Sequence, residues 1–156
     1  MSVPSLSVPE RLLLGPGPSN SHPLVLEALS RQPVGHLDPF YIDLMAEVQD
    51  LLRHVWQTSN RLTLPMSGTG SAAMEATIAN IIEPGETVLV GVKGYFGNRL
   101  VDMASRYQAN VKTIEKPWGE AFSLDEIEAA LVKYKPSVFA LVHAETSTGV
   151  CQPMKE

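Results

Sequence analysis

Short apolar runs that alternate with helical segments constrain the fold of this chain more than any other feature. Such runs occur at 87–90, 111–114 and 138–142, and the last of them, Val-Phe-Ala-Leu-Val, contains no polar residue. Near-continuous apolar strands are typical of a parallel sheet that helices cover on both faces. Strands alternating with helices indicate an α/β domain. We therefore predict an α/β fold with a mainly parallel sheet and helices on both of its faces.

Local capping signals mark the starts of two helices, one before these runs and one between them. Asp38 followed by Pro39 is typical of a helix start, because the carboxylate caps the first turn and proline fits its first position. Ser123 with Glu126 matches the capping box. The predicted helices cover 23–31, 39–57, 72–82, 98–107 and 124–133.

The segment 65–71 is rich in small residues and lies between a further apolar run, 62–64, and the predicted helix 72–82. Glycines let a backbone approach a ligand closely, and the N–H groups at a helix start attract anions. The segment therefore predicts a phosphate site, although an ordinary strand-to-helix turn with a serine cap has the same composition. It lacks the lysine of a Walker loop. Polar residues also follow the later strands at 94–96 and 145–149, as expected at the ligand edge of a parallel sheet.

Composition excludes several classes of protein. The chain has 156 residues, 44% hydrophobic residues and a formal net charge of −5, which favours a globular domain and argues against a nucleic-acid partner. One cysteine, Cys151, allows no internal disulfide. No run approaches the roughly 20 apolar residues that span a bilayer, and the start lacks signal-peptide features. We expect a cytoplasmic protein without a membrane partner.

The last predicted strand, 138–142, and the loop after it finish at Glu156, and nothing remains that could cover a hydrophobic sheet. A central parallel strand needs neighbours on both edges and helices on both faces. We therefore expect a truncated chain, a fragment of a longer protein. A small, complete four-stranded domain is the alternative.

Four separated stretches together resemble one known family. They are LLLGPGPSN (12–20), SGTG (67–70), GYFGNR (94–99) and HAETSTGV (143–150). The set is similar to the class V aminotransferases that use pyridoxal 5'-phosphate, above all the alanine–glyoxylate and serine–glyoxylate aminotransferases of the cyanobacterial type. The resemblance implies part of a type I pyridoxal-phosphate transferase large domain. It divides the chain into an N-terminal arm, 1–20, and the first part of the cofactor-binding large domain, 21–156, without the rest of that domain or the small domain.

The resemblance also implies a cofactor site. Thr69, Gly70 and Ser71 would hold the cofactor phosphate. Phe96 would stack on the pyridine ring, where many relatives have tryptophan, and Thr146 would bond the ring hydroxyl. Taken alone, Phe96 is more typical of core packing and Thr146 of a turn hydroxyl.

Substrate-side loops follow from the same resemblance. They contain Gly17, Pro18, Ser19 and Gly35. No metal site is predicted.

The family's catalytic residues are expected beyond Glu156. They are an aspartate against the pyridine nitrogen, the Schiff-base lysine and a substrate-binding arginine. Lys93 is the nearest lysine in a ligand-side loop, and a substitute would need a buried amine of lowered pKa that faces the cofactor. We therefore predict no catalytic residue here and an inactive chain on its own.

The resemblance implies that the complete enzyme transfers an amino group from alanine or serine to glyoxylate. Its partners would be amino acids, 2-oxo acids and a second copy in a homodimer, with a peroxisomal location in a eukaryote. A cysteine desulfurase-like lyase of the same class is one alternative. A nonenzymatic, flavodoxin-like module that binds a phosphate ligand is the other.

Overall fold

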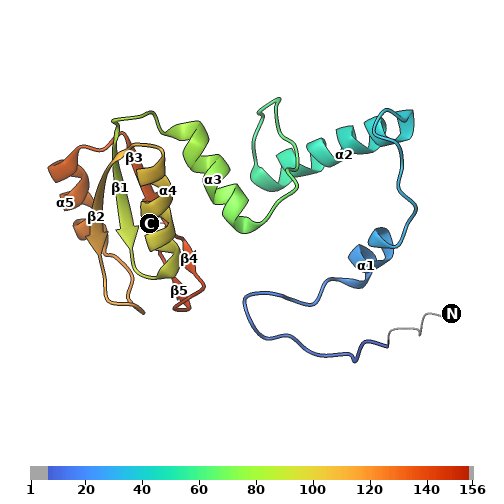
Figure 1. Cartoon of the computed structure of the whole chain (residues 1–156), viewed down its shortest axis with the longest axis horizontal. Helices are drawn as coiled ribbons and strands as arrows, with labels where there is room; N and C mark the ends of the chain where they lie inside the picture. Colours follow the sequence, from blue (N-terminus) through green and yellow to red (C-terminus); the bar gives the residue numbers. More distant parts are fainter. Residues whose placement is uncertain (1–6, 155–156) are drawn as a thin grey trace. The chain divides into compact units, whose positions relative to one another are not determined.

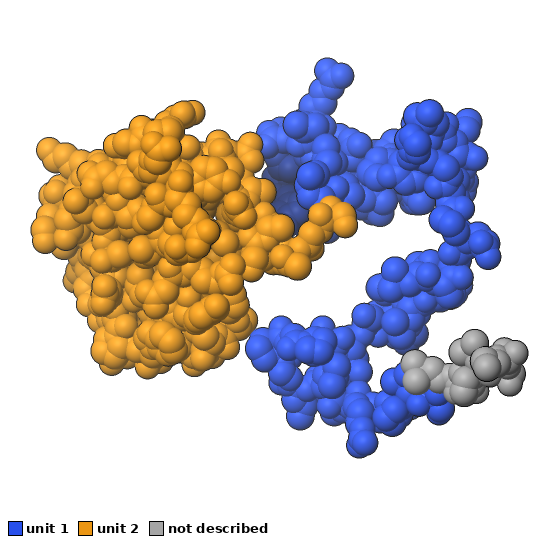
Figure 2. All heavy atoms as spheres, viewed as in Figure 1, with its two compact units in different colours: residues 1–66 blue, residues 67–156 orange. Residues whose placement is uncertain are grey.

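The computed structural model describes residues 7–154 and divides into two compact units, 1–66 and 67–156 (Figure 2). Most of the arm predicted at 1–20 is described, but residues 1–6 lie outside the described range. The division at 66/67 differs from the predicted boundary at 20/21, which stays a prediction. None of the described helices is long and apolar enough to cross a membrane.

The first unit contains two helices, α1 (Pro23–Leu29) and α2 (Pro39–Trp56). The predicted cap of α2 is confirmed, because the Asp38 carboxylate accepts a hydrogen bond of 2.9 Å from the Phe40 N–H. The helix ends where Gln57 takes the left-handed conformation, with φ 49°. Neither helix has a buried residue. The apolar side chains of this unit are therefore largely exposed.

The second unit is built on a three-stranded parallel sheet (Figure 1). Its order is β2-β1-β3, with β1 (Thr87–Val92) between β2 (Asn110–Glu115) and β3 (Val138–Leu141). Both pairings are parallel. The three strongest apolar runs of the sequence therefore form the predicted sheet.

Helices cover both faces of this sheet, as predicted. The helices of the second unit are α3 (Gly70–Ile81), α4 (Tyr95–Arg106) and α5 (Leu124–Tyr134). Side chains of β1 alternate between the faces: Val88 and Val90 join the core beneath α3 and α4, whereas a side chain at Gly91 would point at Phe122 and Leu141 on the α5 side. Since both crossovers of such a sheet are right-handed, α4 and α5 lie on opposite faces.

The core is aliphatic and lies on the α3 and α4 side. Its buried members are Ile78, Ile82, Val88, Val90, Val92, Met103 and Ala104. Burial of one such side chain contributes about 1.5–3 kcal/mol. This packing explains why the runs predicted as strands form the centre of the unit.

A four-stranded domain, the alternative raised by the sequence, would require a strand at 62–64. The apolar run 62–64 forms no strand, and both Leu62 and Leu64 are exposed. A strand needs a hydrogen-bonding neighbour, and none of the described segments pairs with this run. The sheet therefore has three strands among the described residues.

A short hairpin that sequence patterns did not indicate follows β3. Its strands, β4 (Ala144–Glu145) and β5 (Val150–Cys151), pair antiparallel. Gly149 has φ 76°, which a glycine adopts without strain, and its N–H bonds the Glu145 carbonyl at 2.9 Å. Two-residue strands are too short for a periodicity signal. The hairpin nevertheless fixes the loop that carries Thr146.

The capping box at the start of α5 leads to a prediction about pH. The Glu126 carboxylate accepts bonds from the Lys116 amine at 2.6 Å and from the Ser123 N–H at 2.8 Å. These bonds, the one from Lys116 first, lower the pKa of Glu126 from 4.5 to about 2. Because the pKa is lower in the folded chain, the ionised carboxylate stabilises the fold fully above about pH 4.5, and this contribution is lost as pH falls through about 2.

We therefore expect Glu126→Gln to lower the denaturant midpoint at neutral pH. The difference from the parent should shrink as pH falls from about 4.5 towards 2. Midpoints of both proteins across this range measure it. A difference that stays constant down to the lowest pH would contradict the assignment.

Candidate functional site

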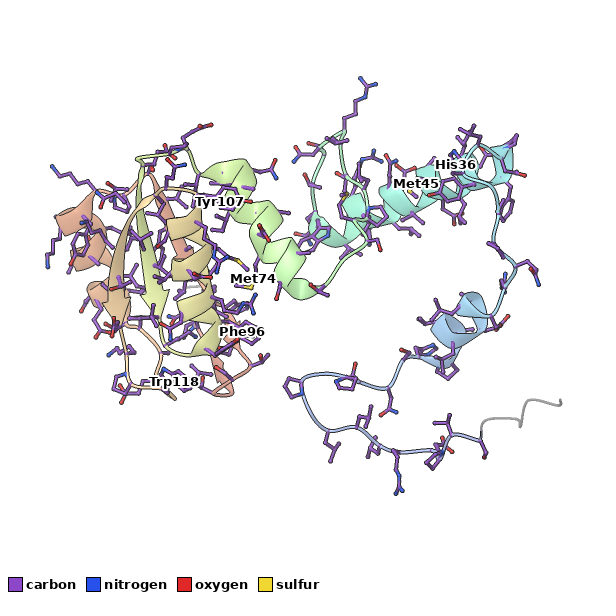
Figure 3. All side chains as sticks on the ribbon, viewed as in Figure 1. His36, Met45, Met74, Phe96, Tyr107 and Trp118 are labelled. Atoms are coloured by element: carbon purple, nitrogen blue, oxygen red, sulfur yellow. The ribbon has the colours of Figure 1, made fainter. Side chains whose placement is uncertain are left out.

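All five residues predicted to bind the cofactor line one hollow in the second unit. The hollow has a volume of about 510 Å³, within the range of roughly 300–1,000 Å³ typical of small-molecule sites. Its lining comprises Thr69, Gly70, Ser71, Met74, Phe96, Leu141, Val142, Ala144 and Thr146. These residues come from the first turns of α3 and α4, from the end of β3, and from the chain between β3 and β5. Figure 3 shows Met74 on α3 and Phe96 on α4.

The start of α3 forms the anion-attracting wall. Thr69 is the N-cap, and its side-chain oxygen accepts a bond of 3.3 Å from the Ala72 N–H. The helix thus begins two residues earlier than predicted, with threonine rather than serine as its cap. The N–H groups of Gly70 and Ser71 have no hydrogen-bond partner among the described residues. Free donors at a helix start attract an anion such as a phosphate.

Phe96 supplies the aromatic wall. Its ring packs edge-on against Tyr95, with centroids 5.3 Å apart and planes at 85°. The side chain is half-buried, and it does not belong to the buried apolar core. Phe96 therefore lines the hollow and is not part of the core. The stacking role remains a prediction.

Thr146 lies in the turn between β4 and β5. It is exposed, and its hydroxyl has no hydrogen-bond partner among residues 7–154. A free hydroxyl on the rim of the hollow suits a bond to a ligand, so the predicted role stays open.

Glu145 is the residue that sequence reasoning missed. Its side chain is completely buried. Its two oxygens accept bonds from the Phe96 N–H at 3.3 Å and the Gly97 N–H at 3.2 Å, and Ser147 donates its hydroxyl to the same carboxylate. Glu145 therefore caps α4 from the hairpin. The only signal in the sequence is Gly94 itself, which precedes α4 and has no side chain that could cap the helix.

Lys93 meets two of the three conditions for a substitute Schiff-base lysine. Its side chain is fully buried, and its amine has no hydrogen-bond partner in the part of the chain that the structure describes. Burial lowers the pKa of Lys93, against the opposing effect of Glu145 and Cys151 nearby. However, Lys93 does not line the hollow. The structure therefore gives it no place facing the predicted ligand.

The predicted substrate-side residues belong to the first unit. Gly17, Pro18, Ser19 and Gly35 are all exposed and lie outside helices. A side chain at Gly17 or Gly35 would meet nothing within 4 Å. Their role towards a substrate stays a prediction.

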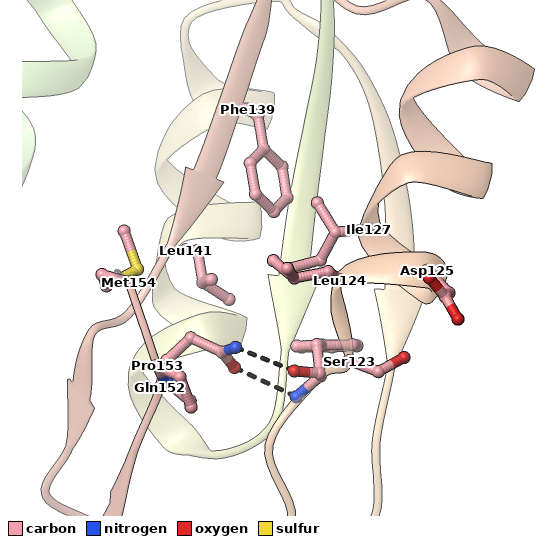
Figure 4. Close-up of a pocket in the computed structure, with 10 residues that line it drawn as sticks. Ser123, Leu124, Asp125, Ile127, Phe139, Leu141, Gln152, Pro153 and Met154 are labelled. Atoms are coloured by element: carbon pink, nitrogen blue, oxygen red, sulfur yellow. Dashed lines mark hydrogen bonds between the residues drawn. The ribbon is translucent and has the colours of Figure 1, made fainter. Parts of the chain in front are cut away.

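A second hollow, of about 590 Å³, lies beside β3 and α5 (Figure 4). The buried Gln152 amide closes one side of it and pairs with the Phe122 backbone, donating to the carbonyl at 2.9 Å and accepting from the N–H at 3.0 Å. These polar groups satisfy one another. None of the predicted site residues lines this hollow, so its larger volume does not make it the better candidate.

Comparison with known families and proteins gives a consistent result. The family described as "Aminotransferase class-V" matches residues 17–156. The alanine–glyoxylate aminotransferase of Mus musculus is 46% identical over 149 residues, which are 96% of this chain and 36% of the mouse protein. The (S)-ureidoglycine–glyoxylate transaminase of Bacillus subtilis is 41% identical over 150 residues, again 96% of this chain and 36% of that protein.

Solved structures agree with this result. The alanine–glyoxylate aminotransferase of Nostoc sp. is 64% identical with a TM-score of 0.91, covering 99% of this chain and 41% of that one. The ureidoglycine–glyoxylate aminotransferase of Bacillus subtilis is 41% identical with a TM-score of 0.90, covering 96% of this chain and 39% of that one. The chain thus spans about 36–41% of the length of these relatives.

Proposed function

This chain belongs to the class V aminotransferases, and we propose that it is the amino-terminal part of the cofactor-binding domain of an enzyme that transfers an amino group from alanine or serine to glyoxylate. The observation that carries the proposal is the single hollow lined by Thr69, Gly70, Ser71, Phe96 and Thr146. The proposal is supported by the family, because class V aminotransferases generally depend on pyridoxal phosphate. The names of the mouse and Bacillus subtilis relatives include glyoxylate, which supports glyoxylate as the acceptor of the amino group.

The hollow fits pyridoxal 5'-phosphate on chemical grounds. Two unpaired N–H groups at the start of α3 match a phosphate, and the helix dipole adds positive potential there. The Phe96 ring offers a stacking surface, which contributes roughly 0.5–1.5 kcal/mol beyond burial. The Thr146 hydroxyl can bond the oxygen on the pyridine ring. The phosphate, the ring face and the ring oxygen of the cofactor thus each have a matching group in this chain.

The bound cofactor would supply an electron sink for bond cleavage at the α-carbon of an amino acid. The residues of this chain would hold the phosphate, offer the Phe96 ring as a stacking surface, and exclude water through Met74 and Leu141. We place the reactive lysine, the aspartate against the ring nitrogen and the substrate-binding arginine outside this chain. The chain by itself would therefore not turn over.

Gly70 offers a direct test of cofactor binding. A methyl group at this position would meet nothing within 4 Å, so Gly70→Ala keeps the backbone donors and serves as the matched control. Gly70→Asp brings a carboxylate to the anion site. We expect Gly70→Asp in the full-length protein to weaken cofactor affinity by roughly tenfold or more, the size of about 1.4 kcal/mol of like-charge repulsion.

Titration of the apoprotein with pyridoxal phosphate, followed by visible absorbance, measures this affinity. If Gly70→Asp binds the cofactor as tightly as Gly70→Ala, the start of α3 is not the phosphate site. Amino transfer is tested in the same full-length protein by the conversion of alanine or serine with glyoxylate into glycine and the matching 2-oxo acid. Release of sulfide from cysteine instead would favour a desulfurase-like lyase, and a flavin spectrum would favour the binding module.

We also propose that the complete enzyme is a cytoplasmic homodimer. Leu12 and Leu14 on the arm are 81% and 88% exposed, as expected of apolar side chains that a partner covers. Sedimentation as a monomer would contradict the dimer, and fractionation away from the cytoplasm would contradict the location.

A further inference from the structure

Two chain segments that are far apart in sequence meet at the buried carboxylate of Glu145. The Phe96 N–H that bonds this carboxylate lies 49 residues away along the chain. The Gly97 N–H bonds its other oxygen, and Ser147 donates its hydroxyl to the first one. The Ser147 oxygen in turn accepts a bond of 3.0 Å from the Tyr95 N–H. The two carboxylate oxygens therefore accept hydrogen bonds from the first turn of α4 and from the hairpin.

This capping arrangement is unlike that of the other helices of the chain. His22, Asp38, Thr69 and Ser123 cap α1, α2, α3 and α5 from the adjacent position in sequence. At α4 that position is Gly94, which gives no side-chain bond. A methyl group there would overlap Cγ and Cδ of Glu145 and lie 2.7 Å from the Ser147 oxygen. A carboxylate from a distant segment thus replaces the local cap and fills the space that a side chain at position 94 would need.

The remote cap couples two walls of the cofactor hollow. Phe96 lines the hollow on one side, and its own N–H bonds Glu145. Thr146, on the other side, is the residue that directly follows Glu145. A shift of the carboxylate would therefore move the aromatic ring and the hydroxyl relative to each other.

We propose that Glu145, assisted by Ser147, is a positioning residue that sets the separation between the Phe96 ring and the Thr146 hydroxyl across the cofactor. The proposal rests on the function proposed above. Glu145 itself touches neither the cofactor nor the substrate, because it does not line the hollow. It acts by accepting hydrogen bonds with both oxygens, which only a carboxylate can do in this place. A glutamine would turn an amide N–H₂ group towards a backbone donor and lose one of the two bonds.

The test compares Glu145→Gln with Glu126→Gln in the full-length protein. Glu126 is a matched control, because its carboxylate also accepts a backbone N–H at a helix start but lies outside the cofactor hollow. The first measurement is hydrogen exchange by mass spectrometry on apoprotein peptides that contain Phe96 and Gly97. We expect Glu145→Gln to speed exchange there by roughly tenfold or more, as for loss of one charge-assisted hydrogen bond. Glu126→Gln should leave exchange in these peptides unchanged.

The second measurement uses the holoprotein. Glu145→Gln should raise the dissociation rate of pyridoxal phosphate by roughly tenfold and shift its visible absorbance band, because the ring and the hydroxyl no longer bracket the cofactor. Glu126→Gln should lower stability without changing the band. Ser147→Ala keeps the carboxylate and should show smaller changes in the same direction. If Glu145→Gln does not fold, Ser147→Ala still tests the proposal.

Two results would overturn the proposal. One is unchanged exchange at Phe96 and Gly97 in both Glu145→Gln and Ser147→Ala. The other is faster exchange with an unaltered band and unaltered retention of the cofactor. Failure of the proposed function is distinguishable from both, since the parent protein would then bind no pyridoxal phosphate at all.

Discussion

Replacement of Gly94 by alanine is expected to lower the unfolding free energy by about 3 kcal/mol or more. Overpacking alone costs about 1–3 kcal/mol. Here the added methyl group would overlap the Glu145 side chain, which is fully buried and bonded to α4. Displacing it leaves a buried carboxylate without its partners, which costs about 3–5 kcal/mol. The effect is steric, because Gly94 has φ 174°, an extended conformation open to any residue.

Chemical denaturation of the full-length protein measures this change. Gly70→Ala is the control, since it also adds one methyl group at the start of a helix but meets nothing within 4 Å. We expect it to change stability by less than about 1 kcal/mol. A double-mutant cycle identifies the cause: in a Glu145→Ala background, Gly94→Ala should cost much less, because only the Ser147 oxygen, 2.7 Å away, then remains in close contact with the methyl group. A cost that persists in this background would assign the effect to another neighbour.

Removal of the Phe96 ring is expected to affect the holoprotein much more than the apoprotein. Truncation of a phenylalanine in a packed core costs about 3–5 kcal/mol whether or not a ligand is bound. Phe96 is only half-buried and lies outside the apolar core, so the loss in the apo form should fall well below that range. With the cofactor bound, Phe96→Ala also removes a stacking surface. Retention of pyridoxal phosphate should therefore fall.

Phe96→Trp is the informative counterpart. A larger ring that faces the hollow can still stack, and retention of the cofactor should be kept or improved. An overpacked core position would instead lose about 1–3 kcal/mol. Unfolding of apo and holo forms of both variants measures these effects. Equal apo and holo losses for Phe96→Ala, together with a destabilised Phe96→Trp, would assign Phe96 to the core and remove it from the cofactor site.

Local sequence determined most of the secondary structure of this protein. The caps at Asp38 and Ser123 join atoms that are at most three residues apart, so their hydrogen bonds follow from the local sequence. The apolar runs at 87–90 and 138–142 became β1 and β3, because each could be buried only as a covered strand. The comparable run at 62–64 formed no strand. Its apolar character was present, but a hydrogen-bonding neighbour was not.

The candidate site was indicated by motif resemblance rather than by periodicity or spacing. The sequence placed Thr69, Phe96 and Thr146 in polar segments after predicted strands, which explains why they could be nominated separately. Only the tertiary structure brings them to one hollow, since their elements meet only when the parallel strands pair in the order β2-β1-β3.

Only the tertiary structure decided where α4 begins and how its start is held. Sequence patterns began this helix at 98, whereas it begins at Tyr95, because Glu145 caps it from the hairpin. The exclusion of a side chain at Gly94 also depends on that hairpin, through Glu145 and Ser147. A hydrogen bond across 49 residues leaves no trace in local propensity, since nothing near Gly94 in the sequence supplies the acceptor. The sequence therefore determined most of the elements and the local caps at Asp38 and Ser123, whereas long-range packing determined the start of α4 and how the walls of the hollow are held together.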